Sequence, residues 1–124
     1  MGKTKIMAVD DDLTTRLILQ STLEEWGYEP VICSSGEEAA DIITNGDEPP
    51  ELLIVDWMMP GLNGLELCKR IRDTHQQEKP YILMLTSRSA RADYINALDA
   101  GADDYLTKPY ENAELKEKIE QGLA

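Results

Sequence analysis

The chain has 124 residues, of which 42% are hydrophobic, and this size and composition predict one domain with a substantial core. Asp and Glu number 24 against 12 Lys and Arg, so the net charge of -12 argues against direct binding to nucleic acid or to an anionic membrane. Every apolar run stops short of the roughly 18 residues of a membrane span, and two cysteines, Cys33 and Cys68, without CxxC spacing favour a reduced, cytoplasmic compartment.

Short apolar runs alternate with longer segments of helical period along the whole chain. Residues 5–9, 28–33, 52–55 and 81–85 form four such runs, and residues 104–107 form a weaker fifth. The runs around Ile6, Leu52 and Ile82 are continuously apolar, as is typical of strands that helices cover on both faces. The alternation predicts a parallel sheet.

The first two segments between these runs carry clear helix signals. The first segment ends at Gly27. Its expected inner face holds Ile18, Leu19, Thr22, Leu23 and Trp26. In the second segment, Ser35 and Glu38 have the spacing of a capping box, and residues 45–46 stop the helix. Its expected inner face holds Ala39, Ala40 and Ile43.

Three further helical segments complete the alternation. The third follows residues 63–64, and its apolar residues are Leu65, Leu67, Cys68 and Ile71. The fourth spans about residues 90–100 and ends at Gly101, and the fifth has one apolar stripe of Leu115, Ile119 and Leu123. These elements predict an α/β fold with a single doubly wound five-stranded parallel sheet, (βα)5, whose carboxyl edge is the expected location of a site.

Polar residues follow the predicted strands at their carboxyl ends. Residues 10–12 are three aspartates after the first run, Asp56 follows the third, Thr86 the fourth, and Lys108 the fifth. Since the ends of parallel strands share one edge, several carboxylates would repel one another there, and a divalent cation would relieve the repulsion. An all-oxygen set of ligands favours Mg2+ over Zn2+ or Fe.

A carboxylate nucleophile beside a metal ion and a lysine is suited to phosphoryl transfer. Asp56 would attack phosphorus, and Lys108 would offset negative charge on the equatorial oxygens. Thr86 would donate a hydrogen bond to the transferring group. These three side chains are therefore the candidate catalytic residues.

Four signatures in order along the chain carry a resemblance to a known family. They are VDD at residues 9–11, DWMMP at 56–60 with Gly64, Thr86, and GADDYLTKP at 101–109. Thr86 and Lys108 lie 30 and 52 residues after Asp56, separations typical of that family. Over essentially its full length the chain resembles a receiver domain of a two-component response regulator. The resemblance implies one receiver domain over residues 1–124, with the flavodoxin-like strand order 2-1-3-4-5.

The resemblance also implies a phosphorylation site and a Mg2+ site. Asp56 is the implied phosphorylation site, and Asp11 and Asp56 are implied to bind Mg2+ directly. Asp10 is implied to do so largely through water, and the backbone carbonyl of Met58 to supply a further oxygen. Asp12 matches no metal position and is expected to cap a helix.

Thr86 and Tyr105 resemble the switch pair of the family. Lys108 is implied to pair with Asp56 at rest and with the phosphoryl group afterwards, and the Lys108-Pro109 bond is cis in relatives. A phosphoryl group adds roughly 1.5 to 2 negative charges, which would draw Thr86 inward and let Tyr105 rotate from exposed to buried. The face of the fourth helix, fifth strand and fifth helix would then differ between states. The alternative for Tyr105 is packing without switching.

The implied partner is a sensor histidine kinase or a histidine phosphotransfer protein, and an output domain or a second copy would contact the switching face. The chain is expected to be a signalling phosphoacceptor, not an enzyme, that catalyses only its own phosphorylation and dephosphorylation. One alternative is a Mg2+-dependent aspartyl-phosphate phosphatase or phosphotransferase. Such enzymes resemble a DxD pattern at the nucleophile, and here Met58 stands in place of its second aspartate. Another is a non-phosphorylated receiver-like interaction module, which would lack an acceptor, a ligand or the lysine.

Two residues predict a slow loss of the phosphoryl group. Met58 and Arg88 lie two residues after Asp56 and Thr86, at positions that flank the path of a hydrolytic water in relatives. Since apolar Met58 cannot orient water and Arg88 is expected to cover the site, the acyl phosphate is predicted to last minutes to hours. The single histidine, His75, is expected to have no metal or catalytic partner.

Overall fold

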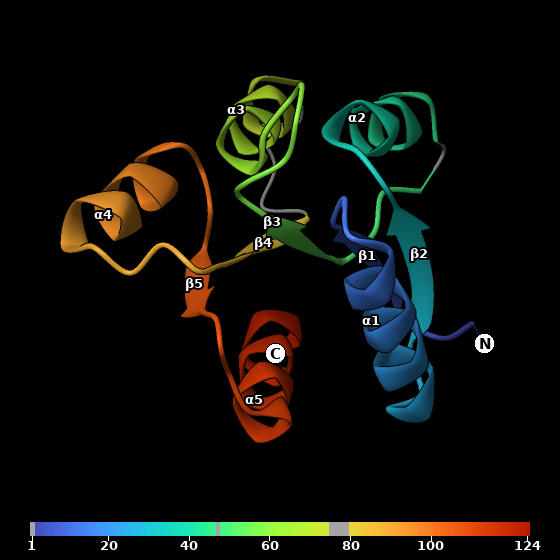
Figure 1. Ribbon diagram of the computed structural model, residues 1–124. Helices are drawn as coiled ribbons and strands as arrows, with labels where there is room; N and C mark the ends of the chain where they lie inside the picture. Colours follow the sequence, from blue (N-terminus) through green and yellow to red (C-terminus); the bar gives the residue numbers. More distant parts are fainter. Residues whose placement is uncertain (1, 47, 75–79) are drawn as a thin grey trace.

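Strands and helices alternate from one end of the chain to the other in the computed structural model, which describes residues 2–46, 48–74 and 80–124 (Figure 1). The strands among these residues are β1 (Lys5–Val9), β2 (Glu29–Cys33), β3 (Leu52–Asp56), β4 (Tyr81–Thr86) and β5 (Asp104–Thr107). The helices are α1 (Leu13–Glu25), α2 (Gly36–Asn45), α3 (Gly64–Thr74), α4 (Arg91–Asp99) and α5 (Asn112–Leu123). The predicted α/β alternation is confirmed, and each strand begins and ends within one residue of its prediction.

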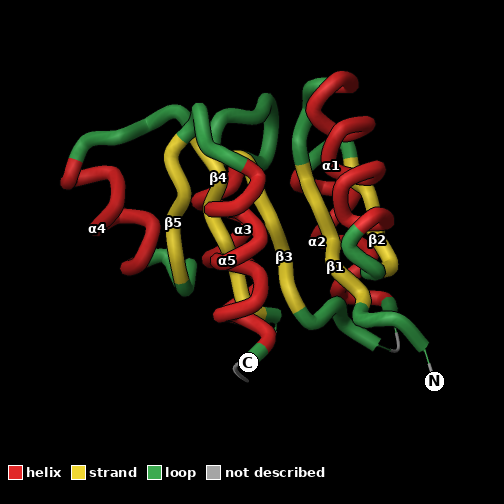
Figure 2. Tube along the Cα trace, turned by 90° about the horizontal axis from the view of Figure 1, so that it is seen from below, coloured by secondary structure: helices red, strands yellow, loops and turns green. Residues whose placement is uncertain are grey.

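The strands form one parallel sheet in the order β2-β1-β3-β4-β5, as the resemblance implies. Helices α1 and α5 cover one face, and α2, α3 and α4 cover the other (Figures 1 and 2). The chain is therefore doubly wound, and its loops at the carboxyl ends of the strands lie along one edge.

Each face of the sheet has its own hydrophobic core, because successive strand residues point to opposite faces. Ile6 and Ala8 pack with the buried residues of α1 and α5, whereas Met7 and Val9 pack with those of α2, α3 and α4. This double burial is the reason why the central runs are continuously apolar. Cys33 and Cys68 are fully buried in the second core, as their apolar surroundings predict.

Side-chain caps start the first two helices where the sequence predicts them. The carboxylate of Asp12 accepts the main-chain N–H of Thr15 at 2.9 Å, so Asp12 caps α1. The hydroxyl of Ser35 accepts the N–H of Glu38 at 3.1 Å, and the Glu38 carboxylate accepts the N–H of Ser34 at 2.7 Å. The reciprocal bond of this capping box therefore reaches one residue further back than predicted.

The prediction for Ile18 on the inner face of α1 is wrong, because this side chain is 54% exposed. Helix α1 buries a narrow stripe that includes Leu19 and Leu23, four residues apart, and Ile18 lies one position off that stripe. His75 lies outside the described residues. None of the helices among the described residues combines the length and the apolar composition needed to cross a membrane.

Candidate functional site

The carboxyl edge of the sheet gathers the polar residues that the sequence singles out. Asp10 and Asp11 follow β1, Asp56 ends β3, Thr86 ends β4, and Lys108 follows β5. The strands are parallel, and their register brings the ends of neighbouring strands level with one another. Residues from four separate parts of the chain therefore surround one small region.

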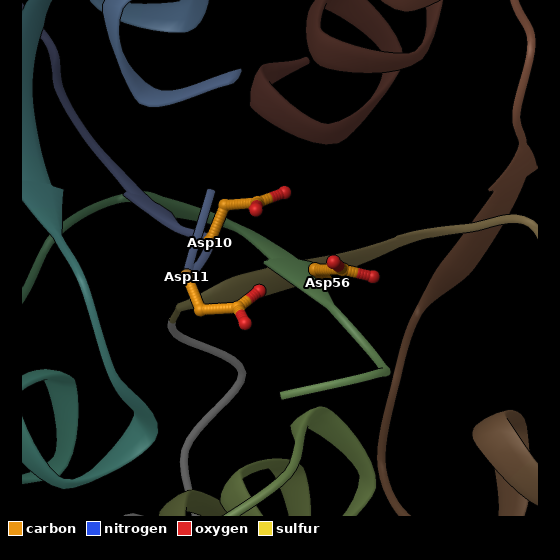
Figure 3. A group of neighbouring side chains, drawn as sticks. All are labelled: Asp10, Asp11 and Asp56. Carbon is orange, nitrogen blue, oxygen red and sulfur yellow. The ribbon is translucent and has the colours of Figure 1, made fainter. Parts of the chain in front are cut away.

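Three carboxylates form the centre of this region. Oxygen atoms of Asp10, Asp11 and Asp56 all lie within 4.8 Å of one another, and Figure 3 shows the side chains gathered at the ends of β1 and β3. Asp10 is only 2% exposed, Asp56 is half-buried and Asp11 is exposed. The N–H of Asp12 donates to Asp10 Oδ1 at 2.9 Å, and the N–H of Met58 donates to Asp56 Oδ1 at 3.3 Å. These bonds leave other carboxylate oxygens for a cation.

Lys108 supplies a positive charge to two of these carboxylates. Its Nζ lies 3.4 Å from Asp10 Oδ2 and 3.7 Å from Asp56 Oδ2. The Lys108-Pro109 peptide bond is cis, as the resemblance implies. The expected pairing of Lys108 with Asp56 is present, and Asp10 shares the same ammonium group at a slightly shorter distance.

The charges at this edge are not balanced within the chain itself. Burial raises the pKa of the Asp56 carboxyl above its ordinary value, the Lys108 ammonium lowers it, and the charges of Asp10 and Asp11 raise it further. The net effect is a raised pKa, so the ionised form of Asp56 is disfavoured. A divalent cation among the three carboxylates would reverse this direction, and their hard oxygen atoms suit Mg2+.

Thr86 connects the site to the loop between β4 and α4. Its side chain is fully buried, and Oγ1 accepts the main-chain N–H of Arg88 at 3.2 Å. Its carbonyl accepts the main-chain N–H of Lys108 at 2.8 Å. The bond from Arg88 uses an oxygen lone pair of Thr86, so the hydroxyl hydrogen is not consumed by it.

Tyr105 lies in the inward position of the predicted switch. It is 8% exposed, and its hydroxyl donates a hydrogen bond to the carbonyl of Arg88. Its ring meets the ring of Trp57 edge to face, with 6.5 Å between centroids. The buried rotamer that the switch requires is thus compatible with the core.

The side chain of Arg88 reaches the loop after Asp56. Its Cζ lies 4.6 Å from the centroid of the Trp57 ring, and Nη1 lies 3.7 Å from Met58 Sδ. Its Nη2 forms an ion pair with Asp93 at 2.9 Å. The sequence singles out Arg88 and Met58, gives Trp57 only as part of a motif without a role, and does not point to Asp93, because an acidic residue five positions after an arginine is a weak signal.

Glu37 holds the β3–α3 loop that carries Met58, and sequence reasoning missed it. Its Oε2 accepts the N–H of Leu62 at 3.1 Å, across 25 residues of sequence. Gly64 lies so close to β3 that a Cβ atom there would be 2.4 Å from the carbonyl oxygen of Asp56. The motif glycine is therefore explained by close backbone approach, whereas no local pattern points to Glu37.

The chain is similar in sequence and in structure to known proteins. The family model of the response regulator receiver domain matches residues 6–120. A chemotaxis protein CheY homolog of Campylobacter jejuni is 41% identical over 120 residues, which are 96% of this chain and 92% of that protein. The chemotaxis protein CheY4 of Vibrio cholerae has a TM-score of 0.89 and 29% identity, over 98% of this chain and 100% of that one. The receiver domain of the sensor histidine kinase PA1611 of Pseudomonas aeruginosa, with a magnesium ion coordinated in its active-site cleft, has a TM-score of 0.86 and 25% identity, over 99% and 98% of the two chains.

Proposed function

The chain belongs to the family of response regulator receiver domains of two-component systems, and from this premise we propose that it accepts a phosphoryl group on Asp56. The donor is a phosphohistidine of a sensor histidine kinase or of a histidine phosphotransfer protein. A receiver domain is a signalling protein rather than a conventional enzyme, and the only reactions proposed for this chain are its own phosphorylation and dephosphorylation. The observation that carries the proposal is the contact of Lys108 Nζ with Asp10 and Asp56, at 3.4 and 3.7 Å, across the sheet edge.

The proposed cofactor is Mg2+. Asp10, Asp11 and Asp56 would hold it, and the backbone carbonyl of Met58 is the proposed fourth source of oxygen. When bound, Mg2+ supplies positive charge that offsets the carboxylates and the phosphoryl oxygens. Two observations support this choice: the crowding of the three carboxylates within 4.8 Å, and the magnesium ion described for the PA1611 receiver domain.

Asp56 supplies the nucleophile. One of its carboxylate oxygens forms a bond to phosphorus as the P–N bond of the donor breaks, and the electron pair of that bond leaves with the imidazole. The ammonium of Lys108 remains beside the oxygens that carry the negative charge, and the hydroxyl of Thr86 donates a hydrogen bond to one of them. Hydrolysis of the resulting aspartyl phosphate by water returns the carboxylate and releases phosphate.

The proposed output is a change on the face formed by α4, β5 and α5. A phosphoryl group adds roughly 1.5 to 2 negative charges beside Thr86. Thr86 contacts the main chain of Arg88, which in turn accepts the hydroxyl of Tyr105 on β5, so the charge has a short physical route to this face. Tyr94 and Ile95 of α4 are exposed there and would contact an output domain or a second copy. The same proposal places the chain in the cytoplasm, where it binds neither nucleic acid nor a membrane directly.

Incubation with acetyl phosphate and Mg2+, followed by intact-mass measurement, tests the proposal. Wild type should gain the mass of one phosphoryl group, whereas Asp56→Asn should gain none, and chelation of Mg2+ should abolish the gain in wild type. The matched control Asp73→Asn changes another aspartate without touching the site and should behave as wild type. Absence of any gain in wild type would favour the interaction module, and rapid turnover of added phosphate esters would favour the phosphatase.

A further inference from the structure

Arg88 contacts both members of the switch pair through its main chain. Its N–H donates to Thr86 Oγ1 at 3.2 Å, and its carbonyl accepts the hydroxyl of Tyr105. The inward position of Tyr105 therefore depends on where the loop between β4 and α4 holds one residue. If that loop moves, the hydroxyl of Tyr105 loses this acceptor, and a residue that is only 8% exposed loses a hydrogen bond.

The side chain of Arg88 contacts the elements on both sides of this loop. Toward β3, the guanidinium lies on the ring of Trp57, with Cζ 4.6 Å from the centroid, and touches the sulfur of Met58 at 3.7 Å. Toward α4, Nη2 pairs with Asp93 Oδ1 at 2.9 Å, and the Asp93 side chain is only 16% exposed. A planar guanidinium can make both contacts at once, because its face meets the ring while its edge donates to the carboxylate.

Tyr105 packs within this same group of residues. Its ring lies edge to face against Trp57, which the Arg88 guanidinium covers, and against Tyr94 of α4, with 5.6 Å between the tyrosine centroids. Outward rotation of Tyr105 would remove both ring contacts and the hydrogen bond to Arg88. The ring and the loop thus stabilise each other.

We propose that Arg88 is a positioning residue that acts as a latch: its contacts with Trp57 and Asp93 hold the β4–α4 loop where its carbonyl keeps Tyr105 inward. The inference rests on the proposed function only in taking Tyr105 as the switch residue. A cation–π contact or a partly exposed ion pair each changes a two-state equilibrium by about two- to fivefold. Loss of both should therefore lower the ratio of inward to outward Tyr105 by about tenfold.

Fluorine NMR of the unphosphorylated protein labelled with 3-fluorotyrosine measures this ratio, with the Tyr105 signal assigned from Tyr105→Phe. In wild type the signals of the inward and outward ring give the reference ratio. Arg88→Ala should lower the inward-to-outward ratio about tenfold, and Asp93→Asn should lower it about threefold. The matched control is Arg91→Ala, which removes the same charge from an exposed residue at the start of α4 and should leave the ratio unchanged.

A fall of threefold or more in Arg88→Ala, with Arg91→Ala within twofold of wild type, supports the latch. A smaller fall in Arg88→Ala, or an equal fall in Arg91→Ala, overturns it. If Arg88→Ala does not fold, Asp93→Asn and Arg88→Lys, which keeps the charge but loses the planar group, decide by the same threshold. Because the ratio is measured without phosphate, failure of the latch is distinct from failure of Asp56 to gain a phosphoryl group by intact mass.

Discussion

Substitution of Lys108 by Met removes an ammonium group from the centre of the site and retains an unbranched side chain. The Nζ atom lies 3.4 Å from Asp10 Oδ2 and 3.7 Å from Asp56 Oδ2, and the Lys108 side chain is 28% exposed. Its loss leaves three carboxylates that repel one another, one of which, Asp10, is almost fully buried. We expect Lys108→Met to lower the free energy of unfolding when no divalent cation is bound.

The distances set the size of this effect. At an effective dielectric constant of about 20, unit charges at these two separations attract by about 5 and about 4.5 kcal/mol before the cost of removing them from water is counted. Breaking a fully buried pair costs about 3–5 kcal/mol, whereas an exposed pair contributes about 0–1 kcal/mol. Lys108 is between these cases, so a loss of about 2 kcal/mol is expected.

The free energy of unfolding is measured by urea titration, first with a chelator and then with saturating Mg2+. Lys108→Met removes the ammonium group beside the metal site and should therefore bind Mg2+ more tightly than wild type. Each tenfold gain in Mg2+ affinity reduces the difference in the free energy of unfolding between variant and wild type by about 1.4 kcal/mol. The control is Lys118→Met, which breaks the pair of Lys118 with Asp104 at 3.0 Å, away from the carboxylates. The difference in the free energy of unfolding between Lys118→Met and wild type should be smaller and should not change with Mg2+.

An equal difference in the free energy of unfolding between Lys108→Met and wild type, with and without Mg2+, would refute this prediction. That result would mean that the metal ion and the ammonium do not act on the same carboxylates. A gap that appears only with Mg2+ would contradict it equally.

Other substitutions test separate parts of the account. The pKa of the Asp56 carboxyl is raised on folding, so without metal Asp56→Asn should be more stable than wild type at neutral pH. In urea titrations this advantage should fade as the pH falls through the folded pKa toward the ordinary value of 3.8. An advantage that does not depend on pH would be inconsistent with the raised pKa. Phosphorylated wild type should lose its phosphoryl group over minutes to hours, and faster in Met58→Asn, by intact mass over time; loss within seconds in wild type counts against shielding by Met58 and Arg88. Gly64→Ala places a Cβ atom 2.4 Å from the Asp56 carbonyl oxygen and should lower the free energy of unfolding by about 2–4 kcal/mol. Gly2→Ala has nothing within 4 Å of the new Cβ atom and should change this free energy by less than about 0.5 kcal/mol. Equal effects would show that the close approach of Gly64 to β3 is not a constraint.

The sheet was predictable because its strands are buried on both faces. A continuous apolar run such as residues 52–55 and a polar residue directly after it are both local in the sequence, and the parallel arrangement follows from the alternation with helices. The burial of Ile18 was predicted wrongly, since apolar spacing alone does not say how wide a stripe the neighbouring strands can cover.

The components of the site were predictable from motif spacing, but the contacts around them were not. Asp56 and Lys108 are marked by the strands that they end, and the sheet necessarily brings those ends together. The contact of Arg88 with Trp57 and the bond from Leu62 to Glu37 join loops that are distant in the sequence. Their geometry depends on how each loop folds over the sheet edge, for which the sequence holds no periodic signal.

The central claim is that one carboxylate, that of Asp56, receives the phosphoryl group. Borohydride reduction of the protein after incubation with acetyl phosphate and Mg2+, followed by peptide mass mapping, locates the acyl phosphate, because this reagent reduces it to an alcohol. In wild type, residue 56 should be converted to homoserine, with Asp10 and Asp11 unmodified. Reduction at another aspartate, or homoserine at residue 56 without added acetyl phosphate, would contradict it.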